Sequence, residues 1–301
     1  MEVVTATTMS PMCCTVTLPS LYMVITLFGI YFQTVTIYVY LKDSFYRNNI
    51  SYRILCIIGI ETLLHMLFFL TLIPYGFTCE RRRERFIEVT GIISNFSHYI
   101  NEPLGILLAL NRYTEICIPH FKCNRGTKRT YNLLALFVFL LVIPITIWLF
   151  TGDDCKIYYF CYRYSVYKDC GKISYIRGRN FMIYSCLFAE IIVYIVIVGH
   201  VAAQRTITGE KLRLRAPEKR LLLMSITHFV TALWRHLGQH INNVFFVYEP
   251  FSQVSSITVV VMADVVTAIL PLMFNKPLLL DVLNIYSAKN SRASDSATTS
   301  M

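Results

Sequence analysis

Seven long apolar stretches divide the 301-residue chain, and they constrain its fold more than any other feature. Each is close to or above the ~20 mostly apolar residues that a helix needs to cross the hydrocarbon core of a bilayer. Backbone groups in lipid must bond within the chain, so helices are the expected form. The pattern therefore predicts an all-α membrane protein with a seven-transmembrane helix bundle. The stretches are Leu18–Leu41, Tyr52–Phe77, Phe86–Leu110, Tyr131–Phe150, Phe181–Val201, Leu221–Tyr248 and Phe251–Phe274.

The composition agrees with lipid as the main solvent of the chain. The sequence is 55% hydrophobic and 15% charged, whereas soluble domains carry about 25% charged residues. Too few polar residues remain to cover a water-soluble core of this size. The net charge of +10 is typical of some nucleic-acid-binding proteins, but here the basic residues lie in short runs between apolar stretches. We therefore expect the lipid bilayer as a partner and exclude nucleic acid.

The distribution of basic residues predicts the orientation, because cytoplasmic loops are enriched in Lys and Arg. With the N-terminus outside, the inner segments hold 17 of the 28 basic residues and the outer segments hold 10. Residues 1–17 contain no Lys or Arg, whereas Lys42 follows the first stretch, as in a retained signal anchor. We expect a short extracellular N-terminus over 1–17, a transmembrane domain over 18–274 and a cytoplasmic C-terminus.

Two segments follow the seventh stretch, and they differ in character. Apolar residues recur at helical spacing from Pro277 to Tyr286, which predicts an interfacial helix within 275–286. Residues 287–301 are rich in Ser and Thr, which predicts a disordered cytoplasmic tail.

Four of the ten cysteines fall in the expected outer loops, where disulfides can form. Four cysteines allow three pairings, and the sequence does not choose among them. We expect one bridge from Cys79 to the loop after the fourth stretch. The disulfide candidates are Cys79, Cys155, Cys161 and Cys170.

The inner end of the third stretch carries the most specific motif in the chain. It reads Asn111-Arg112-Tyr113-Thr114-Glu115-Ile116-Cys117-Ile118-Pro119, which is similar to the Asp-Arg-Tyr region of rhodopsin-like receptors. Across most of residues 18–285 the chain resembles the nematode serpentine chemoreceptors, a divergent set of seven-helix receptors. Besides the motif, the resemblance rests on the short N-terminus and the very short loop at Glu249-Pro250.

This resemblance implies a G-protein-coupled chemosensory receptor in the plasma membrane of a sensory neuron or its cilium. A small odorant or pheromone would bind among the outer halves of the helices, and the inner ends would engage a heterotrimeric G protein. The resemblance assigns G-protein coupling to Arg112, Tyr113, Ile116 and Pro119. It implies no cofactor, and the Ser/Thr-rich tail would be a site for a kinase or an arrestin.

Three features depart from the rhodopsin-like pattern. Asn111 stands where that family has Asp, so the carboxylate that restrains the arginine is missing. Trp234 in the sixth stretch lacks the Pro that usually follows it. The seventh stretch ends in Leu270-Pro271-Leu272-Met273-Phe274 where Asn-Pro-x-x-Tyr would be expected. These departures fit a divergent relative and leave open how Arg112 is held at rest.

Ionisable side chains inside the apolar stretches are the main candidates for ligand binding. Each costs at least ~2.5 kcal/mol at the centre of a membrane helix, so such residues face the bundle and mark functional sites. Arg235 is expected to pair with Asp264 or Glu190, as a ligand contact, an activation switch or a static bridge. His236, His240 and Asn243 share one helix face. The ligand-binding candidates are Arg235, His236, Gln239, His240, Asn243, Asp264, Glu190 and His98.

Other functions have weaker support in the sequence. Glu61 and Glu102 fall at similar depth, where two carboxyls can share a proton or a cation. His236 and His240 form a His-x-x-x-His pair that can bind one face of a metal, but the seven histidines form no second pair. We therefore expect neither a metal nor an enzyme activity. The alternatives that remain are a channel or transporter with its N-terminus inside and, below it, a His-box membrane enzyme.

Overall fold

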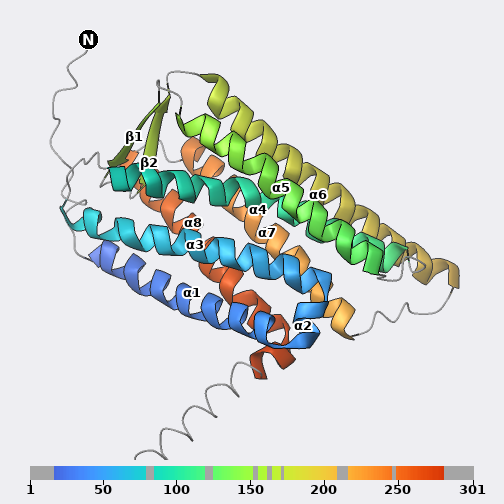
Figure 1. The fold of residues 1–301 in the computed structure, drawn as a ribbon. Helices are drawn as coiled ribbons and strands as arrows, with labels where there is room; N and C mark the ends of the chain where they lie inside the picture. Colours follow the sequence, from blue (N-terminus) through green and yellow to red (C-terminus); the bar gives the residue numbers. More distant parts are fainter. Residues whose placement is uncertain are drawn as a thin grey trace, which may run out of the picture.

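A computed structural model describes residues 17–78, 85–118, 125–151, 155–160, 165–170, 173–208, 216–245 and 249–280. Over these residues the chain is almost entirely helical, with seven long helices (Figure 1). Each of the seven predicted apolar stretches is helical over its described residues, which confirms the helical assignment; residues 246–248 of the sixth stretch lie outside the described part. The long helices are α1 (Thr17–Lys42), α3 (Ile50–Thr78), α4 (Arg85–Cys117), α5 (Arg125–Thr151), α6 (Ile173–Thr208), α7 (Ala216–Phe245) and α8 (Glu249–Phe274).

Two smaller elements mark the two ends of the bundle. The short helix α2 (Ser44–Asn48) joins α1 to α3, and Asp43 caps it by accepting a hydrogen bond from the backbone N–H of Phe45. Between α5 and α6 the strands β1 (Cys155–Phe160) and β2 (Ser165–Cys170) form an antiparallel hairpin. Figure 1 shows the hairpin at one end of the bundle and α2 at the other. These ends are called the hairpin end and the α2 end below.

The helices pack so that α4 occupies the middle of the bundle. It contacts α3, α5, α6 and α7, whereas α1 packs between α3 and α8, and α7 packs on α8. The approach of α1 to its neighbours is close at Gly29. A Cβ atom there would lie 2.7 Å from the sulfur of Met66 on α3 and 2.8 Å from a methyl group of Val265 on α8. Small residues let membrane helices approach in this way.

Three of the helices are long and apolar enough to cross a membrane on length and composition alone, within the described part of the chain. They cover Pro19–Lys42, Ile50–Thr71 and Asn180–Gln204, and two shorter apolar helices cover Arg129–Pro144 and Thr258–Phe274. The chain therefore has the character of a membrane protein.

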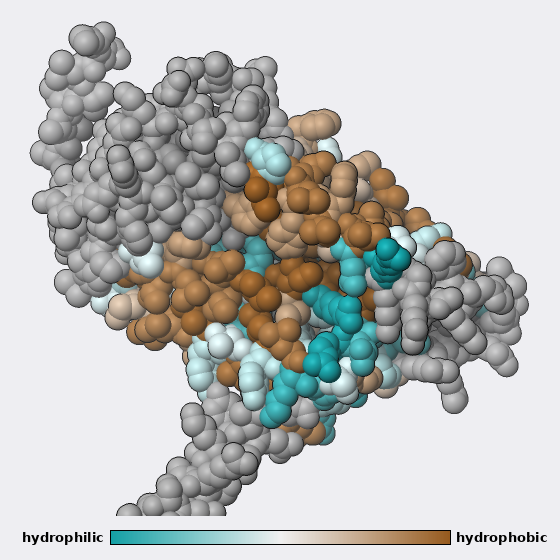
Figure 2. Space-filling model, in the orientation of Figure 1, coloured by the Kyte–Doolittle hydropathy of each residue, from teal (hydrophilic) through white to brown (hydrophobic). Residues whose placement is uncertain are grey.

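The outer surface of the described helices is apolar, as expected for contact with lipid. Phe181, Phe188 and Ile195 recur every seven residues along one face of α6 and are 76%, 65% and 64% exposed. Figure 2 shows brown, hydrophobic surface over the middle of the described helices and teal, hydrophilic residues towards the α2 end. Charged and amide side chains lie inside instead, among them Glu102, Arg112, Arg235 and Asp264.

The chain after α8 continues as a short helical segment and then leaves the described part. Residues 276–280 form a helical turn, in which the N–H of Leu279 donates to the carbonyl of Asn275 at 2.9 Å. The amide of Asn275 also donates to the Tyr52 hydroxyl at 3.1 Å, which ties this turn to α3. The rest of the predicted interfacial helix, the tail over 287–301 and residues 1–16 lie outside the described residues.

Candidate functional site

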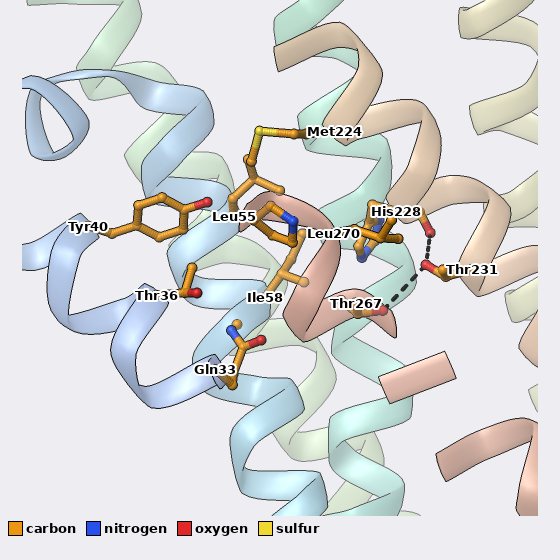
Figure 3. Close-up of a pocket in the computed structure, with 12 residues that line it drawn as sticks. Gln33, Thr36, Tyr40, Leu55, Ile58, Met224, His228, Thr231, Thr267 and Leu270 are labelled. Carbon is orange, nitrogen blue, oxygen red and sulfur yellow. Dashed lines mark hydrogen bonds between the residues drawn. The ribbon is translucent and has the colours of Figure 1, made fainter. Parts of the chain in front are cut away.

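A small cavity lies between α1, α3, α7 and α8, towards the α2 end (Figure 3). Gln33, Thr36 and Tyr40 line it from α1, and His228 and Thr231 line it from α7. The sequence instead placed the ligand pocket towards the opposite end of α7. The side chains of Gln239, His240 and Asn243, which would form that pocket, lie outside the described part of the structure, and so does that of His98.

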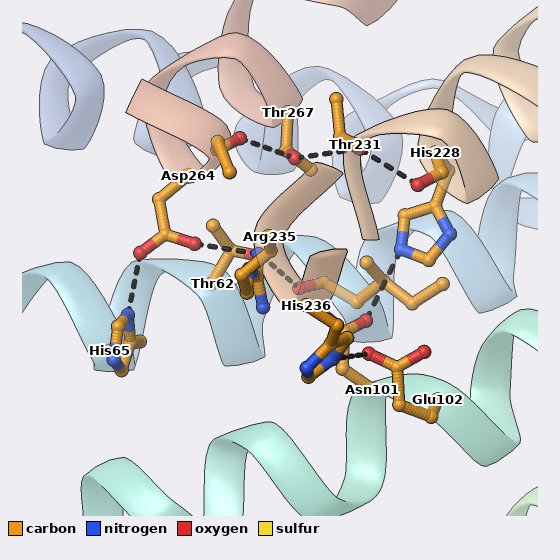
Figure 4. Close-up of polar contacts among 12 residues, drawn as sticks. Thr62, His65, Asn101, Glu102, His228, Thr231, Arg235, His236, Asp264 and Thr267 are labelled. Atoms are coloured by element: carbon orange, nitrogen blue, oxygen red, sulfur yellow. Dashed lines mark hydrogen bonds and ion pairs between the residues drawn. The ribbon is translucent and has the colours of Figure 1, made fainter. Parts of the chain in front are cut away.

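The centre of the bundle contains a buried ion pair that joins three helices. Arg235 on α7 donates from Nη2 to Oδ1 of Asp264 on α8 at 2.7 Å. His65 on α3 donates from Nδ1 to the other oxygen, Oδ2, at 2.6 Å. Asp264 is 2% exposed, and both partners are buried (Figure 4). Of the two partners expected for Arg235, the structure selects Asp264.

The next residue on α7 makes the matching contact to α4. His236 donates from Nε2 to Oε1 of Glu102 at 2.8 Å. Two turns before it, His228 donates from Nε2 to Oδ1 of Asn101 at 3.2 Å. Arg235 and His236 are neighbours in sequence, yet they reach different helices (Figure 4). The seven residues of these contacts are called the buried polar network: His65, Asn101, Glu102, His228, Arg235, His236 and Asp264.

The buried polar network ties α3, α4, α7 and α8 together where little water is available. A charge in such surroundings is tolerated only if it is paired and hydrogen-bonded. Each charged group of the network has at least one such partner. The network can therefore act as a static clamp, or as a switch that a ligand opens by replacing one partner.

Glu190 on α6 is the one ligand-binding candidate without such a contact in the described residues. It is 1% exposed, and neither carboxyl oxygen has a hydrogen-bond partner among the described side chains and backbone groups. Its oxygens lie against Gly105 on α4, where an added Cβ would be 3.0 Å from Oε2. A buried carboxyl with no protein partner is costly. Glu190 is therefore a buried group with both carboxyl oxygens available for a further hydrogen bond.

At the α2 end, the predicted coupling arginine is held from two sides. Arg112 is 0% exposed, and its Nη2 contacts Oε2 of Glu115 at 2.6 Å, three residues further along α4. The same nitrogen donates to the hydroxyl of Ser51, in the first turn of α3, and the amide of Asn111 donates to that hydroxyl as well. Nε and Nη1 of Arg112 have no hydrogen-bond partner among the described residues.

The remaining residues of the motif pack into the bundle. Ile116 is buried, with Tyr113 packed beside it, in a cluster that includes Tyr194 and Ile197 of α6. The hydroxyl of Thr114 lies 3.1 Å from that of Tyr131 on α5. Ile116 is thus a core residue in this conformation, although the resemblance assigns it to coupling. Pro119 lies outside the described residues.

The hairpin brings two of the disulfide candidates opposite each other. Cys155 is the register partner of Cys170 at the open end of β1 and β2. Directly opposed residues in antiparallel strands have Cα atoms about 4.5–5.5 Å apart, within the range that disulfides use. This register favours one of the three pairings that the sequence left open. It leaves Cys161 for the expected bridge from Cys79, and both of these lie outside the described residues.

We expect a disulfide to join Cys155 to Cys170, because the backbone register places the two residues opposite each other before oxidation. Non-reducing proteolysis with mass spectrometry should recover a peptide that links the two. Cys56, which is buried in α3, is the control and should be found as a free thiol. A linkage of Cys155 to Cys79 instead would show that the register does not direct oxidation.

Metal binding has no support in the part of the chain that the structure describes. No group of three or more His, Cys, Asp or Glu side chains there is arranged to hold a metal ion. Of the predicted His-x-x-x-His pair, His236 already donates to Glu102.

Comparison with known proteins adds no assignment: no family model matches the chain, and no curated protein is significantly similar to it.

Four contributors to these contacts were missed at the sequence level: Glu115, Asn101, Ser51 and His228. Glu115 was detectable, because residues three apart on a helix are neighbours and an acid there can reach Arg112. Asn101 stands beside Glu102 in an apolar stretch, so its polarity was a signal as well. Ser51 carried no signal, because a serine in the first turn of a helix has many roles and its contact with α4 depends on tertiary packing.

Proposed function

We propose that this chain is a seven-helix chemosensory receptor of the plasma membrane, which binds a small molecule among its helices and activates a heterotrimeric G protein. The proposal takes all seven long helices as membrane spans, with the N-terminus outside and the α2 end in the cytoplasm. Under it, Arg112 is the residue whose release permits coupling, and the buried polar network responds to the ligand.

The burial pattern of α7 supports a transmembrane position for this helix, despite its charged residues. Trp234 and Leu237 are exposed on its outer face, whereas Arg235 and His236 between them are buried and paired. A helix with apolar residues outside and paired polar residues inside is compatible with lipid. The same argument covers α4, because Glu102 is paired and neighbouring helices surround α4.

The clamp on Arg112 is the observation that carries the coupling proposal. The Arg112 guanidinium is fixed by Ser51 on α3 and by Glu115 on its own helix. Two of its nitrogens remain without a described partner, and a guanidinium stays charged and offers five donors. A group that is held by a few bonds and has donors in reserve is suited to a change of partner. We take this conformation as the resting state.

The ligand would act at the level of the buried polar network and on the hairpin side of it. Arg235 and His236 already have acidic partners, so a ligand that meets them must displace Asp264 or Glu102. Glu190 requires no displacement and can accept a hydrogen bond from an amine or hydroxyl group. The proposal therefore favours small molecules that carry a hydrogen-bond donor.

The test is a G-protein dissociation assay in cells that express the tagged chain, with pools of small molecules as stimuli. We expect at least one pool to give a response that Arg112→Ala abolishes at equal surface expression. Arg129→Ala is the matched control, because Arg129 is an exposed basic residue at the same end of the bundle, and it should retain the response. A response that survives Arg112→Ala contradicts the coupling role.

The channel or transporter alternative has its N-terminus inside, whereas the receptor proposal requires the N-terminus outside and the C-terminus in the cytosol. Protease protection of terminal tags in microsomes should find the N-terminal tag in the lumen and the C-terminal tag in the cytosol. Both tags on one side, or an inside N-terminus, would place Arg112 away from G proteins and would end the receptor proposal.

A further inference from the structure

The cavity towards the α2 end is lined by polar atoms that lack protein partners. Gln33 Oε1, Thr36 Oγ1 and Tyr40 Oη on α1 have no hydrogen-bond partner among the described residues, and neither does Nδ1 of His228 on α7. All four residues line this cavity and are more than nine-tenths buried. Figure 3 shows the α1 side chains on one side of it and His228 on the other. Buried polar groups are normally hydrogen-bonded, so four such groups around one space require a partner.

The backbone adds a further acceptor at the same place. Pro271 and Thr267 on α8 line the cavity. Proline has no N–H, so Pro271 cannot donate to the carbonyl of Thr267 four residues earlier. The Thr267 hydroxyl donates to the carbonyl of Ala263 at 2.8 Å and does not replace that bond. The Thr267 carbonyl therefore lacks its regular helical partner next to the cavity.

The size and chemistry of the cavity identify what it can bind. Its volume, taken as the space open to the centre of a water molecule, is about 20 Å³, and one water molecule needs roughly 10–15 Å³ by this measure. No Asp or Glu is among the described residues that line it, so nothing there compensates the charge of a cation. Hydroxyls supply donors, and the Gln33 oxygen supplies an acceptor. Nδ1 of His228 is also an acceptor in the neutral ring, because Nε2 carries the proton that is donated to Asn101.

We propose that this cavity is a structural water site, in which one or two ordered water molecules hydrogen-bond α1 to His228 of the buried polar network. α1 contributes no residue to that network directly, so the water site is its polar connection to α4 and α7. Gly59 also lines the cavity. The absence of a side chain there leaves room for the amide of Gln33, with which a Cβ at Gly59 would collide. The proposal does not depend on the receptor function.

The sign of a stability change tests the proposal. Tyr40→Phe and Thr36→Val each remove one polar atom and keep the shape of the side chain. If water occupies the site, each change loses a hydrogen bond, and we expect the melting temperature of the purified full-length protein in nanodiscs to fall by roughly 2–4 °C. If the cavity is dry, each change removes an unpartnered polar atom, and the melting temperature should rise. A rise in both variants overturns the proposal.

A double variant and a direct observation complete the test. Thr36 and Tyr40 would share water. The melting temperature of the double variant should therefore fall by clearly less than the sum of the decreases in the two single variants. Thr34→Val is the matched control, because Thr34 is exposed on α1 and donates to the carbonyl of Ile30. If each single variant lowers the melting temperature no more than Thr34→Val does, and the two decreases add up in the double variant, shared hydration is overturned. A density map that resolves ordered water elsewhere should show a peak within hydrogen-bonding distance of Tyr40 and His228, and empty density there also overturns the proposal.

Discussion

The Asp264→Ala protein is expected to be less stable than the wild type by about 3–5 kcal/mol. Asp264 accepts from Arg235 with one oxygen and from His65 with the other. Its removal leaves a guanidinium in the interior of the bundle without its acid, and this is the costly way to break a buried pair. The measurement is thermal or chemical unfolding of the purified protein in nanodiscs, together with the yield of folded protein.

Two further variants separate the structural and functional roles of this ion pair. Arg235→Met combined with Asp264→Leu removes both charges, and we expect it to recover most of the lost stability, because apolar residues can replace a buried pair at little cost. Met262→Ala, at an exposed position of α8, is the control and should change stability by about 0.5 kcal/mol. A stable double variant that has lost a ligand response identifies a switch, whereas one that still responds identifies a static bridge. If Asp264→Ala matches the control, the pair does not hold the bundle.

Glu115→Gln is expected to raise the basal G-protein activity of the chain about fivefold. The Glu115 carboxylate holds Arg112 at 2.6 Å, and its side chain is 28% exposed. Because of this solvent exposure, the ion pair stabilises the resting conformation by only about 1 kcal/mol. Its loss corresponds to a shift of about fivefold in a two-state equilibrium. The readout is nucleotide exchange by co-expressed G proteins without ligand, corrected for surface expression.

The control for this variant is Glu218→Gln, which removes a similar charge at the start of α7, at the same end of the bundle. It should leave basal exchange unchanged. Glu115→Asp keeps the charge on a shorter side chain and should fall between the wild type and Glu115→Gln. If the wild type, Glu115→Asp and Glu115→Gln have equal basal activity, Glu115 does not restrain Arg112. No residue would then replace the carboxylate that is missing at Asn111.

The helices were predictable where the apolar run alone identifies them. α1, α3 and α6 satisfy a length and hydropathy test without any knowledge of packing. α4 and α7 required the further assumption that residues such as Glu102 and Arg235 are paired inside the bundle, and the structure supports that assumption. The hairpin was missed, although Ile157, Tyr158 and Tyr159 have strong strand propensity. The sequence analysis predicts only a loop between the fourth and fifth apolar stretches, because the apolar pattern there carries no span.

The candidate site was predictable in composition and not in pairing. Their similar depth in the membrane identifies Asp264 and Glu190 as possible partners of Arg235. Depth alone does not determine how each helix is rotated or which helices are neighbours. The structure answers this by packing α7 on α8, where Asp264 is within reach. The contact between Arg112 and Ser51 has the same origin. It joins residues that are 61 positions apart, and only the approach of α3 to α4 creates it.

The two contacts made by consecutive residues of α7 define a pivot point, about which this helix can tilt. Arg235 reaches α8 and His236 reaches α4, so turning α7 about its axis in either sense carries both side chains away from their acids. Tilting about that point preserves both bonds far better. From Ala216 to Arg235 the helix extends about 30 Å, so a tilt of about 10° would move its far end by about 5 Å and would break the contact of His228 with Asn101 on the way. Under the proposed function, a small displacement at mid-bundle would therefore become a larger one at the α2 end.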